Sequence, residues 1–418
     1  MTALSDEMEG ITYHNNHNVF ILGAGFSVDA GLPTMKTFIR DMRYAISWAD
    51  SQNHSDIKQD LINTLKFIKT SSSAGYRCKI DLYNIEDVFS LFDAMPSGEV
   101  TQRKRFSMQK AIAATLEYRI AEYRAKPKTV LLHIPTHVDT SLDDNYLELL
   151  NDEEGPSRKK VIPIYEAITA ILSSKFSVKD REPQPKNTVI TFNYDTLIEE
   201  SLERMSIPYN LGISNNSFPL SITSLYAASG NQYDNESSLQ LLKLHGSIGW
   251  ALSNDSSHMN IYQTAGQLFA ASDQGYEQMV LEPPTWNKGK SAPILQSVWD
   301  SAITALSTAT RIFVIGYSLP LTDSHFKYLM SASLMNNISL ENIYFVNPSF
   351  NGDNDVSHMQ ERILTILRED LRMDGTVQLL PHKSTDFLLA PGVNGHLDKT
   401  FFPFISMPSL DISFFAYR

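Results

Sequence analysis

The amino-acid sequence predicts a doubly wound α/β protein with a mostly parallel sheet and a large helical insertion. Short apolar runs rich in β-branched residues recur along the chain, and each ends at a turn residue. Such runs are typical of strands buried on both faces, as in a parallel sheet covered by helices. Helical patterns lie between several of these runs, and this alternation predicts helices on both faces of one sheet.

The candidate strands and helices alternate in chain order. The strands are predicted at residues 18–22, 188–191, 241–244, 279–281, 311–315, 342–346 and 376–380. The helices are predicted at residues 196–205, 294–308, 324–336 and 356–373. Because such sheets bind ligands beyond the carboxyl ends of their strands, the residues just after each strand are the candidate site.

The interval between the first two strands is longer than a single crossover helix requires. Apolar residues recur every four positions from Met108 to Ile120, as on one face of a helix, and residues 56–70 show a similar pattern. We therefore expect this interval to be mostly helical.

Three parts follow from this pattern. They are a discontinuous α/β domain of residues 1–35 and 171–395, a helical insertion of residues 36–170, and a C-terminal extension of residues 396–418. The extension is rich in aromatic residues, which we expect to pack on the chain's own core or, in the alternative, to contact another subunit.

The composition predicts a cytoplasmic protein. The formal net charge is -12, whereas non-specific nucleic-acid binding relies on a basic surface. Cys78 is the single cysteine, so an internal disulfide and a four-cysteine zinc site are excluded. The N-terminus is acidic, and no apolar run approaches the ~20 residues of a membrane span. We expect no signal peptide, membrane contact, zinc or direct nucleic-acid binding.

A glycine-rich loop follows the first strand. Gly23 and Gly25 allow a tight turn and a close approach of the backbone to a ligand. A helix that begins there would direct N–H groups towards a phosphate. Gly31 comes six residues after Gly25, not three as in the usual dinucleotide fingerprint. The loop alone therefore fits a phosphate site or an ordinary strand-to-helix turn.

Polar residues also follow the next two strands. Asn193 and Asp195 come after the second strand, and His245 comes after the third. An asparagine amide donates and accepts hydrogen bonds without charge, and an aspartate can cap the following helix. A neutral imidazole accepts a proton near neutral pH. Taken one at a time, these residues also fit a capped turn and a structural histidine.

Together these residues carry a family resemblance. They are Gly23, Ala24, Gly25, Ser27, Gly31 and Pro33 in the first loop, Asn193 and Asp195 in the second, His245 and Gly246 in the third, Gly316 and Ser318 in the fourth, and Asn347 in the fifth. In this order, they resemble the motifs of the sirtuins. The resemblance implies a Rossmann-like, sirtuin-like fold that binds NAD.

The chain departs from the deacylating sirtuins in two ways. Those enzymes continue the first motif with Asp-Phe-Arg, where this chain has Thr34 and Met35. They also carry a four-cysteine zinc module, which a single cysteine cannot build. The Asn193-Tyr194-Asp195 segment instead resembles the sirtuin-like branch of bacterial immunity proteins.

The resemblance also implies a role for each matched residue. Asn193 would orient the ribose or the attacking water, His245 would act as base, and Asp195 would hold the Asn193 loop. The pyrophosphate of NAD would lie against the first loop, formed by Gly23, Ala24, Gly25, Ser27, Gly31 and Pro33. The adenosine side would lie against Gly316, Ser318 and Asn347.

The function implied by the resemblance is an NAD glycohydrolase that releases nicotinamide and ADP-ribose. Water is the expected acceptor because both departures remove features of the deacylases. Relatives in the immunity branch deplete NAD in anti-phage defence, so activity would be restrained by oligomerisation or by a partner. A chain of this architecture resembles those paired with a separate HerA-type hexameric ATPase.

Three other functions stay open from the sequence. An inactive fold could serve as an NAD- or ADP-ribose-sensing binding module, although it would not need both Asn193 and His245. A protein ADP-ribosyltransferase would transfer the ribosyl group to protein instead of water. A nuclease subunit of a DNA-processing complex is disfavoured, because the sequence offers no carboxylate cluster for two-metal catalysis.

Overall fold

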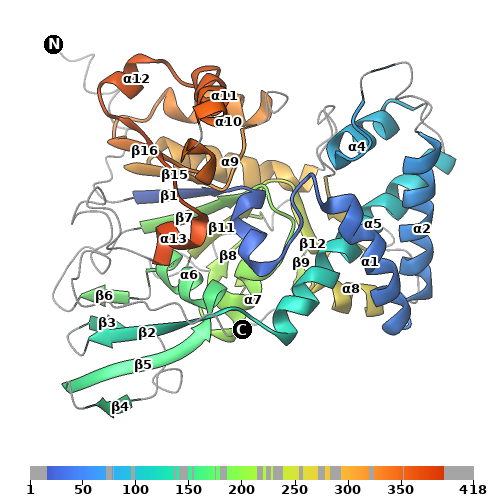
Figure 1. The fold of residues 1–418 in the computed structure, drawn as a ribbon, viewed down its shortest axis with the longest axis horizontal. Coiled ribbons are helices and arrows are strands. Elements are labelled where there is room, and N and C mark those ends of the chain that lie inside the picture. Colours follow the sequence, from blue (N-terminus) through green and yellow to red (C-terminus); the bar gives the residue numbers. More distant parts are fainter. Residues whose placement is uncertain are drawn as a thin grey trace.

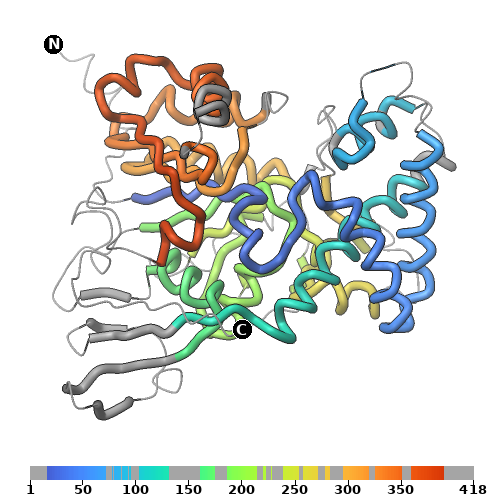
Figure 2. The backbone as a smooth tube through the Cα atoms, in the orientation of Figure 1, coloured from blue at the N-terminus to red at the C-terminus, as the bar shows by residue number. Residues whose placement is uncertain are grey.

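The computed structural model describes most of the chain between residues 17 and 389 (Figures 1 and 2). The described ranges are 17–71, 78, 80–95, 99–135, 138–140, 149–152, 155–174, 176–178, 186–213, 220–222, 227–228, 239–253, 258–271, 278–282, 293–319, 324–351 and 353–389. The aromatic extension predicted at residues 396–418 lies outside the described residues.

An eight-stranded sheet forms the centre of the molecule, with the strand order β10-β8-β11-β7-β1-β15-β16-β17. Its strands are β1 (His17–Leu22), β7 (Lys186–Thr191), β8 (Tyr209–Asn210), β10 (Ala227–Ala228), β11 (Leu239–Lys243), β15 (Arg311–Ile315), β16 (Asn342–Val346) and β17 (Val377–Leu380). All neighbouring pairs in this sheet are parallel. The predicted fold class is therefore confirmed.

The strand order identifies the type of doubly wound sheet. Numbered along the chain, the six strands from β11 to β17 have the order 3-2-1-4-5-6, which is the order of dinucleotide-binding folds. In that order the connections reverse direction beside the first strand, here between β1 and β15. Ligands of such folds bind beyond the strand ends at this switch point.

The central strands are buried on both faces, as their apolar sequences predict. All six residues of β1 are buried, and Phe20 stacks on Phe313 of β15 with ring centroids 4.8 Å apart. Phe313 in turn stacks on Tyr344 of β16 at 5.2 Å. This ladder of rings covers three strands and joins the two halves of the sheet.

Helices cover both faces of the sheet (Figure 1). On one face, α6 (Ile164–Leu172) packs against α7 (Leu197–Arg204) and α13 (Ser384–Leu389). On the other, α9 (Pro293–Ser307) packs against β11 and α10 (Ser324–Leu334). The helix predicted at 356–373 is two helices, α11 (Asp353–Leu364) and α12 (Asp370–Met373). None of the helices in the described ranges is long and apolar enough to cross a bilayer.

The interval after β1 contains the expected helices. They are α1 (Phe38–Ser51), α2 (Ser55–Thr70), α4 (Ile85–Asp93) and α5 (Glu99–Ala125), after the short 3-10 helix η1 (Ala24–Ala30). On α5 the four-residue repeat is buried, including Met108, Ile112 and Ile120. Bidentate contacts from Arg119 of α5 to the buried Asp41 of α1, at 2.8 and 3.1 Å, fix these two helices together.

The same interval also contains strands that the sequence did not predict. β2 (Thr129–Pro135), β4 (Leu149–Asp152) and β5 (Gly155–Pro163) form an antiparallel sheet with the order β2-β5-β4. β3 (Val138–Thr140) pairs with β6 (Phe176–Val178). The expectation that the interval is mostly helical therefore fails in this part. Pairing such as Thr129 with Pro163 joins distant residues, so helical periodicity carries no sign of it.

A second, smaller sheet corrects one strand prediction. Residues 279–281 were expected in the parallel sheet, but β14 (Gln278–Leu281) pairs antiparallel with β12 (Gly246–Leu252). β13 (Met259–Ile261) and β9 (Leu220–Ile222) complete this sheet, which has the order β14-β12-β13-β9. Its neighbours are α5 and α8 (Ala265–Ala271). Gln109 of α5 donates a 2.6 Å hydrogen bond to the Leu281 carbonyl and so attaches the insertion to this sheet.

Candidate functional site

The candidate residues lie in the loops that follow the carboxyl ends of the central strands. Leu22, the last residue of β1, pairs with Thr191 of β7 on one side and with Ile315 of β15 on the other. Thr191 pairs with Lys243 of β11, and Ile315 pairs with Val346 of β16. The strands therefore end in one row, and the loops that follow them lie side by side across the switch point.

The first glycine loop packs directly against the loop that follows β15. The Gly23 amide donates to the Ile315 carbonyl at 3.0 Å, and the Gly25 amide donates to the Gly316 carbonyl at 2.8 Å. A Cβ atom on Gly23 would lie 2.6 Å from the Tyr317 Cα. These glycines are therefore required by backbone packing between two loops.

This packing bears on the predicted pyrophosphate contact. The Gly23 and Gly25 amides donate to carbonyl oxygens of the neighbouring loop. Gly31 ends η1 with a φ of 80°, and its amide donates to the Val28 carbonyl at 2.8 Å. It therefore serves as a helix C-cap. Pro33 is buried beyond it.

Side chains from two helices hold the far side of the glycine loop. The hydroxyl of Tyr165 on α6 donates a 2.6 Å hydrogen bond to the Phe26 carbonyl. Burial raises the pKa of Tyr165 well above its usual range, so this hydroxyl keeps its proton. The hydroxyl of Thr385 on α13 donates to Asp29 at 2.6 Å. The loop is thus held by side chains that lie 139 and 356 residues away in the sequence.

Asn193 is anchored by its amide group. Its Nδ2 donates to the Gly23 carbonyl at 2.9 Å and to the Ser27 hydroxyl at 3.1 Å, and its own backbone amide donates to Thr191 Oγ1 at 3.0 Å. A backbone carbonyl only accepts, so the Gly23 contact fixes which end of the amide is NH₂. The half-buried side chain therefore has a defined orientation.

Asp195 is buried and connects this loop to the first one. Ser27 donates a 2.7 Å hydrogen bond to its Oδ2, while its Oδ1 accepts the Leu197 amide at 3.3 Å at the start of α7. Desolvation raises the pKa of Asp195, although the nearby Lys243 ammonium and the Ser27 hydroxyl lower it. Asp195 is thus tied both to the first glycine loop and to the start of α7.

His245 lies just beyond β11, which is the strand next to β7. The residue is 6% exposed, and its ring meets Phe192 edge-on at 5.2 Å and lies 6.1 Å from the Tyr194 ring. Its carbonyl accepts the Glu282 amide at 2.9 Å. Both aromatic neighbours flank Asn193 in sequence, so the histidine ring lies beside the Asn193 loop.

Gly246 permits the turn after the histidine. Its φ is 78°, and a Cβ atom there would lie 2.0 Å from the Val280 carbonyl oxygen. The Tyr194 hydroxyl donates to the Glu282 carbonyl at 2.5 Å, next to the same turn. The smaller sheet thus supports the histidine loop from outside.

The predicted adenosine-side residues lie across the switch point. Asn347 Nδ2 donates to the Tyr317 carbonyl at 3.4 Å, and its Oδ1 accepts the Ser349 amide at 3.0 Å. The exposed Ser318 receives a hydrogen bond on its carbonyl from Arg362 at 2.8 Å. Tyr317 stacks on Phe192 at 4.9 Å, which brings the two halves of the site into contact.

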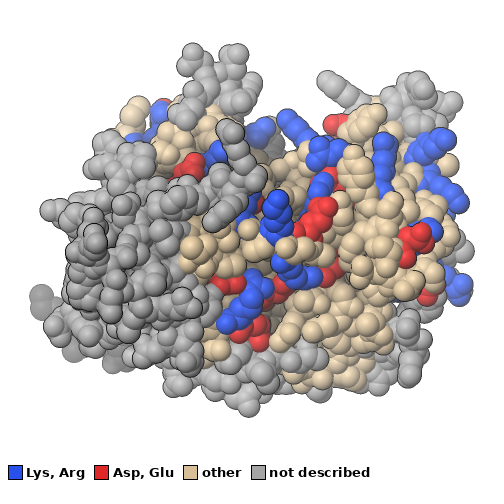
Figure 3. All heavy atoms as spheres, turned by 60° about the horizontal axis from the view of Figure 1, so that its bottom comes forward, with Lys and Arg blue, Asp and Glu red and all other residues tan. Residues whose placement is uncertain are grey.

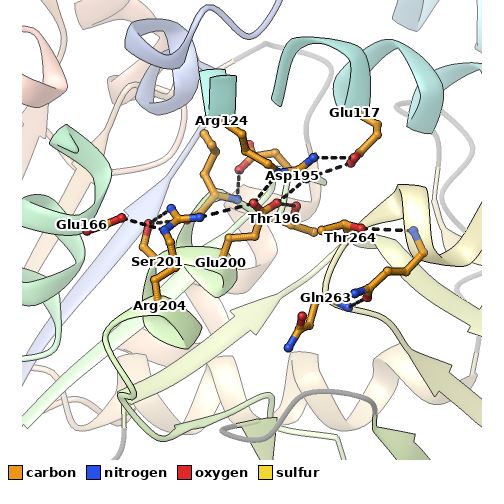
Figure 4. Close-up of polar contacts among 12 residues, drawn as sticks. Glu117, Arg124, Glu166, Asp195, Thr196, Glu200, Ser201, Arg204, Gln263 and Thr264 are labelled. Carbon is orange, nitrogen blue, oxygen red and sulfur yellow. Dashed lines mark hydrogen bonds and ion pairs between the residues drawn. The ribbon is translucent and has the colours of Figure 1, made fainter. Parts of the chain in front are cut away.

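A polar network on α5, α6 and α7 lies behind Asp195 (Figure 4). Arg124 of α5 donates to Glu200 of α7 at 2.7 Å and to Glu117 at 2.7 Å. Glu200 also accepts the Thr196 hydroxyl at 2.6 Å. Because Thr196 directly follows Asp195, this network connects the insertion to the candidate site.

On the face shown in Figure 3, acidic and basic side chains of the described residues are intermixed. A nucleic-acid surface instead gathers Lys and Arg in one patch or stripe. This face therefore gives no support to the nuclease alternative.

The family comparison covers the second half of this site. Residues 187–366 match the family model of the SIR2-like domain. The match covers less than half of the chain and contains Asn193, Asp195, His245, Gly316, Ser318 and Asn347. The first glycine loop lies outside it. No curated protein matches the chain.

Several solved structures are also similar. A Sir2 homologue in complex with NAD is 13% identical, over 89% of this chain and 86% of that chain, with a TM-score of 0.40. A mutant Sir2 homologue in complex with ADP-ribose is 14% identical, over 89% of this chain and 88% of that chain, with a TM-score of 0.40.

The SIR2-like segment also contains site residues that the sequence reasoning missed. Lys243 and Glu199 form a buried ion pair next to Asp195, at 2.6 Å. The aromatic rings of Phe192, Tyr194 and Tyr317 surround the histidine loop or stack between the two halves. A lysine at the end of an otherwise apolar strand was the available signal for the ion pair, since a lone buried lysine requires a partner.

Proposed function

We propose that this chain is an NAD glycohydrolase, which cleaves the bond between nicotinamide and ribose and releases nicotinamide and ADP-ribose. One observation carries the proposal: Asn193, oriented through its amide, and His245 follow the neighbouring strands β7 and β11, on one side of the switch point of a dinucleotide-type sheet. The match of this segment to the SIR2-like domain supports NAD as the substrate.

The reaction consumes one water molecule. The C1′–N bond of NAD breaks, its electron pair leaves with nicotinamide, and positive charge spreads over the ribose, as in other glycosyl transfers. A water oxygen then forms the new bond to C1′ and loses a proton. Nicotinamide leaves as a neutral molecule, so the step requires a base and no general acid for the leaving group.

Asn193 is suited to orient the ribose hydroxyl or the water. Both of its amide protons are directed at Gly23 and Ser27, which leaves Oδ1 as its acceptor. Among the described residues, none donates to this oxygen. A carbonyl oxygen held in one orientation can accept a hydrogen bond from a hydroxyl or a water, and so places the reacting atom.

His245 is suited to take the proton. Its ring lies beside Phe192 and Tyr194, at the end of the strand adjacent to Asn193. A histidine at such a position contributes about 10²–10⁴-fold to a proton transfer when it acts as general base. The surrounding rings exclude bulk water and hold the imidazole plane.

Water is favoured over an acyl-lysine as the acceptor. Thr34 and Met35 stand where the deacylases have Asp-Phe-Arg, and Cys78 is the single cysteine. Without four cysteines the chain cannot assemble the zinc module of those enzymes.

We further propose that this NADase acts in the cytoplasm as an effector of anti-phage defence. Depletion of NAD would starve the host cell, so the activity requires control. We propose that control comes from homo-oligomerisation or from a HerA-type hexameric ATPase. These statements rest on the resemblance to the sirtuin-like branch of bacterial immunity proteins.

The test is nicotinamide release from NAD by the purified chain, alone and with a co-encoded ATPase. We expect Asn193→Ala and His245→Ala to lower kcat by about 100-fold or more, since each removes a group that acts on the reacting atoms. The matched controls are Asn63→Ala and His54→Ala, which change the same residue types in the insertion.

Each outcome distinguishes a function. Release that is lost in both site variants and kept in both controls supports the hydrolase. NAD that binds but is not cleaved under any condition contradicts it and favours the sensing module. Label from the ADP-ribose half of NAD that ends on protein instead of in free ADP-ribose favours the transferase.

A further inference from the structure

Lys243 is a buried cation placed between the two candidate catalytic residues. It is the last residue of β11, two residues before His245, and it is 1% exposed. Its Nζ donates to the main-chain carbonyl of Asp195, which lies two residues after Asn193. One side chain therefore connects the His245 strand to the Asn193 loop.

Resting on the NAD glycohydrolase function proposed above, we propose that Lys243 is a positioning residue: its ammonium group, held by Glu199, fixes the Asp195 carbonyl and thereby sets Asn193 relative to His245. The group does not need to touch the substrate. It acts through the backbone of the loop that carries Asn193.

The ammonium group of Lys243 contacts Glu199 and the Asp195 carbonyl, and the two contacts have different effects. Glu199 of α7 accepts from Lys243 at 2.6 Å, and the two side chains are 1% and 9% exposed. Burial of an ammonium group without a counter-ion is costly, because the charge is removed from water. Glu199 supplies the counter-ion of Lys243, and a charge-assisted hydrogen bond to the carbonyl is stronger than a neutral one.

Backbone hydrogen bonds also hold the β7 and β11 loops together near Lys243. The Leu244 amide donates to the Thr191 carbonyl at 3.0 Å, and the Ile248 amide donates to the Tyr194 carbonyl at 3.0 Å. These bonds join the segment after β7 to the segment after β11, up to the residue before Asp195. Among the contacts of the described residues, the ammonium of Lys243 provides the side-chain hydrogen bond to the Asp195 carbonyl itself.

A purely structural ion pair is the competing explanation, and the insertion offers one for comparison. Arg119 and the buried Asp41 pair at 2.8 Å between α1 and α5. That pair joins two helices, and within the described part of the chain it contacts no loop of the candidate site. Loss of either pair costs stability, but only loss of Lys243 releases the Asp195 carbonyl.

The test uses double variants, because removal of Lys243 alone leaves Glu199 buried without a counter-ion. Lys243→Met/Glu199→Gln removes both charges, and Arg119→Met/Asp41→Asn does the same in the insertion. Amide hydrogen exchange is measured by mass spectrometry over residues 191–197. NAD cleavage is measured with kcat and KM separated, and ADP-ribose affinity is measured on the same proteins.

We expect faster exchange over residues 191–197 in the Lys243 double variant and not in the Arg119 double variant. We also expect kcat to fall by about 10- to 100-fold, since a displacement of about 1 Å at a reacting group can cost 10²-fold. KM and ADP-ribose affinity should change by less than about threefold, because the dinucleotide-binding loops are retained.

Exchange and kcat equal to wild type in the Lys243 double variant would overturn the inference. Equal loss in both double variants would do the same, because it would show a general effect of destabilisation. If the wild-type chain cleaves no NAD, the proposed function fails. The hydrogen-exchange comparison then still decides whether Lys243 holds the loop.

Discussion

The hydroxyl of Ser27 donates a 2.7 Å hydrogen bond to Oδ2 of Asp195, 168 residues further along the chain. The same hydroxyl accepts a hydrogen bond from Asn193 at 3.1 Å. Ser27 therefore joins the first glycine loop to both polar residues that follow β7. Its position between them explains why a serine is required there, since a hydroxyl donates and accepts at once.

Replacement of Ser27 tests whether its hydroxyl holds Asn193 and Asp195 in place. In Ser27→Ala, Asn193 loses one of its two anchors and the buried Asp195 loses a donor. A hydrogen bond to a charged group contributes about 1.5–3 kcal/mol, so we expect kcat/KM for NAD cleavage to fall by about tenfold to 100-fold. Steady-state kinetics measures the loss.

Ser333→Ala is the matched control for Ser27→Ala. Ser333 is also buried and donates to the Leu329 carbonyl at 2.7 Å within α10, away from the site. Its replacement should leave kcat/KM unchanged. Full activity in Ser27→Ala would contradict the proposal that Ser27 holds Asn193 and Asp195 in place.

A second prediction concerns the contact between the two glycine loops. Gly316 has a φ of 64°, and a Cβ atom there would lie 2.4 Å from the Phe26 nitrogen. Gly316→Ala should destabilise the fold by about 3 kcal/mol or more, because overpacking adds to backbone strain. Chemical unfolding monitored by circular dichroism measures the change.

Gly375→Ala is the control, because it has the backbone strain of Gly316→Ala without the overpacking. Its φ is 85°, and a Cβ atom there would meet nothing within 4 Å. Gly375→Ala should therefore cost only about 1 kcal/mol. Equal losses in the two variants would show that the loop contact is less tight than the backbone geometry indicates.

A third prediction concerns the attachment of the insertion. Arg124→Met leaves the carboxylates of Glu117 and Glu200 without their shared counter-ion, and both are buried. We expect a loss of about 2–3 kcal/mol in the free energy of unfolding, below the full value for a completely buried pair because Arg124 is 29% exposed.

An exposed ion pair of the same helical layer is the control for Arg124. Lys58 pairs with Asp50 at 2.6 Å, with side chains 37% and 63% exposed. Lys58→Met should change the free energy of unfolding by less than about 1 kcal/mol. A loss in Arg124→Met as small as this would show that the network does not hold the insertion.

The fourth prediction is a pH dependence of stability. Desolvation raises the pKa of Glu166 above its ordinary value of 4.5, although Arg204 lowers it. The folded chain therefore binds this proton more tightly than the unfolded chain. Between 4.5 and the raised pKa, the free energy of unfolding falls as the pH rises.

Glu166→Gln removes this contribution. From pH 4.5 up to the raised pKa of Glu166, wild type should lose stability more steeply than the variant as the pH rises, when urea unfolding is measured at each pH. Glu117 and Glu199, whose pKa values burial also raises, give a background slope shared by both proteins. Parallel slopes in the two proteins would mean that Glu166 titrates alike when folded and unfolded.

The sequence was sufficient for six of the eight strands of the central sheet, because these are local, apolar runs with turn residues at their ends. It did not predict the two-residue strands β8 and β10. β1, β7, β11, β15, β16 and β17 all lie where such runs stand. It was not sufficient for β2 and β5, or for the antiparallel pairing of β14. Their hydrogen bonds form between residues that no local pattern connects.

In the candidate site too, the sequence indicates some features and only the structure shows the others. Gly23, Asn193, Asp195 and His245 could be selected from the sequence, because each follows a strand and strand ends of a parallel sheet meet at one edge. Their partners could not. Only the tertiary structure decides that the Gly23 and Gly25 amides are used by the loop after β15.

The sequence by itself therefore determined six strands of the parallel sheet and the residues that follow them. The tertiary structure alone decided that Ser27 joins Asn193 to Asp195, and that Lys243 reaches the Asp195 carbonyl. The physical reason is the separation along the chain of the residues that interact. Strand formation depends on neighbours in the chain, whereas a buried hydrogen bond depends on which distant groups folding brings within about 3 Å of one another.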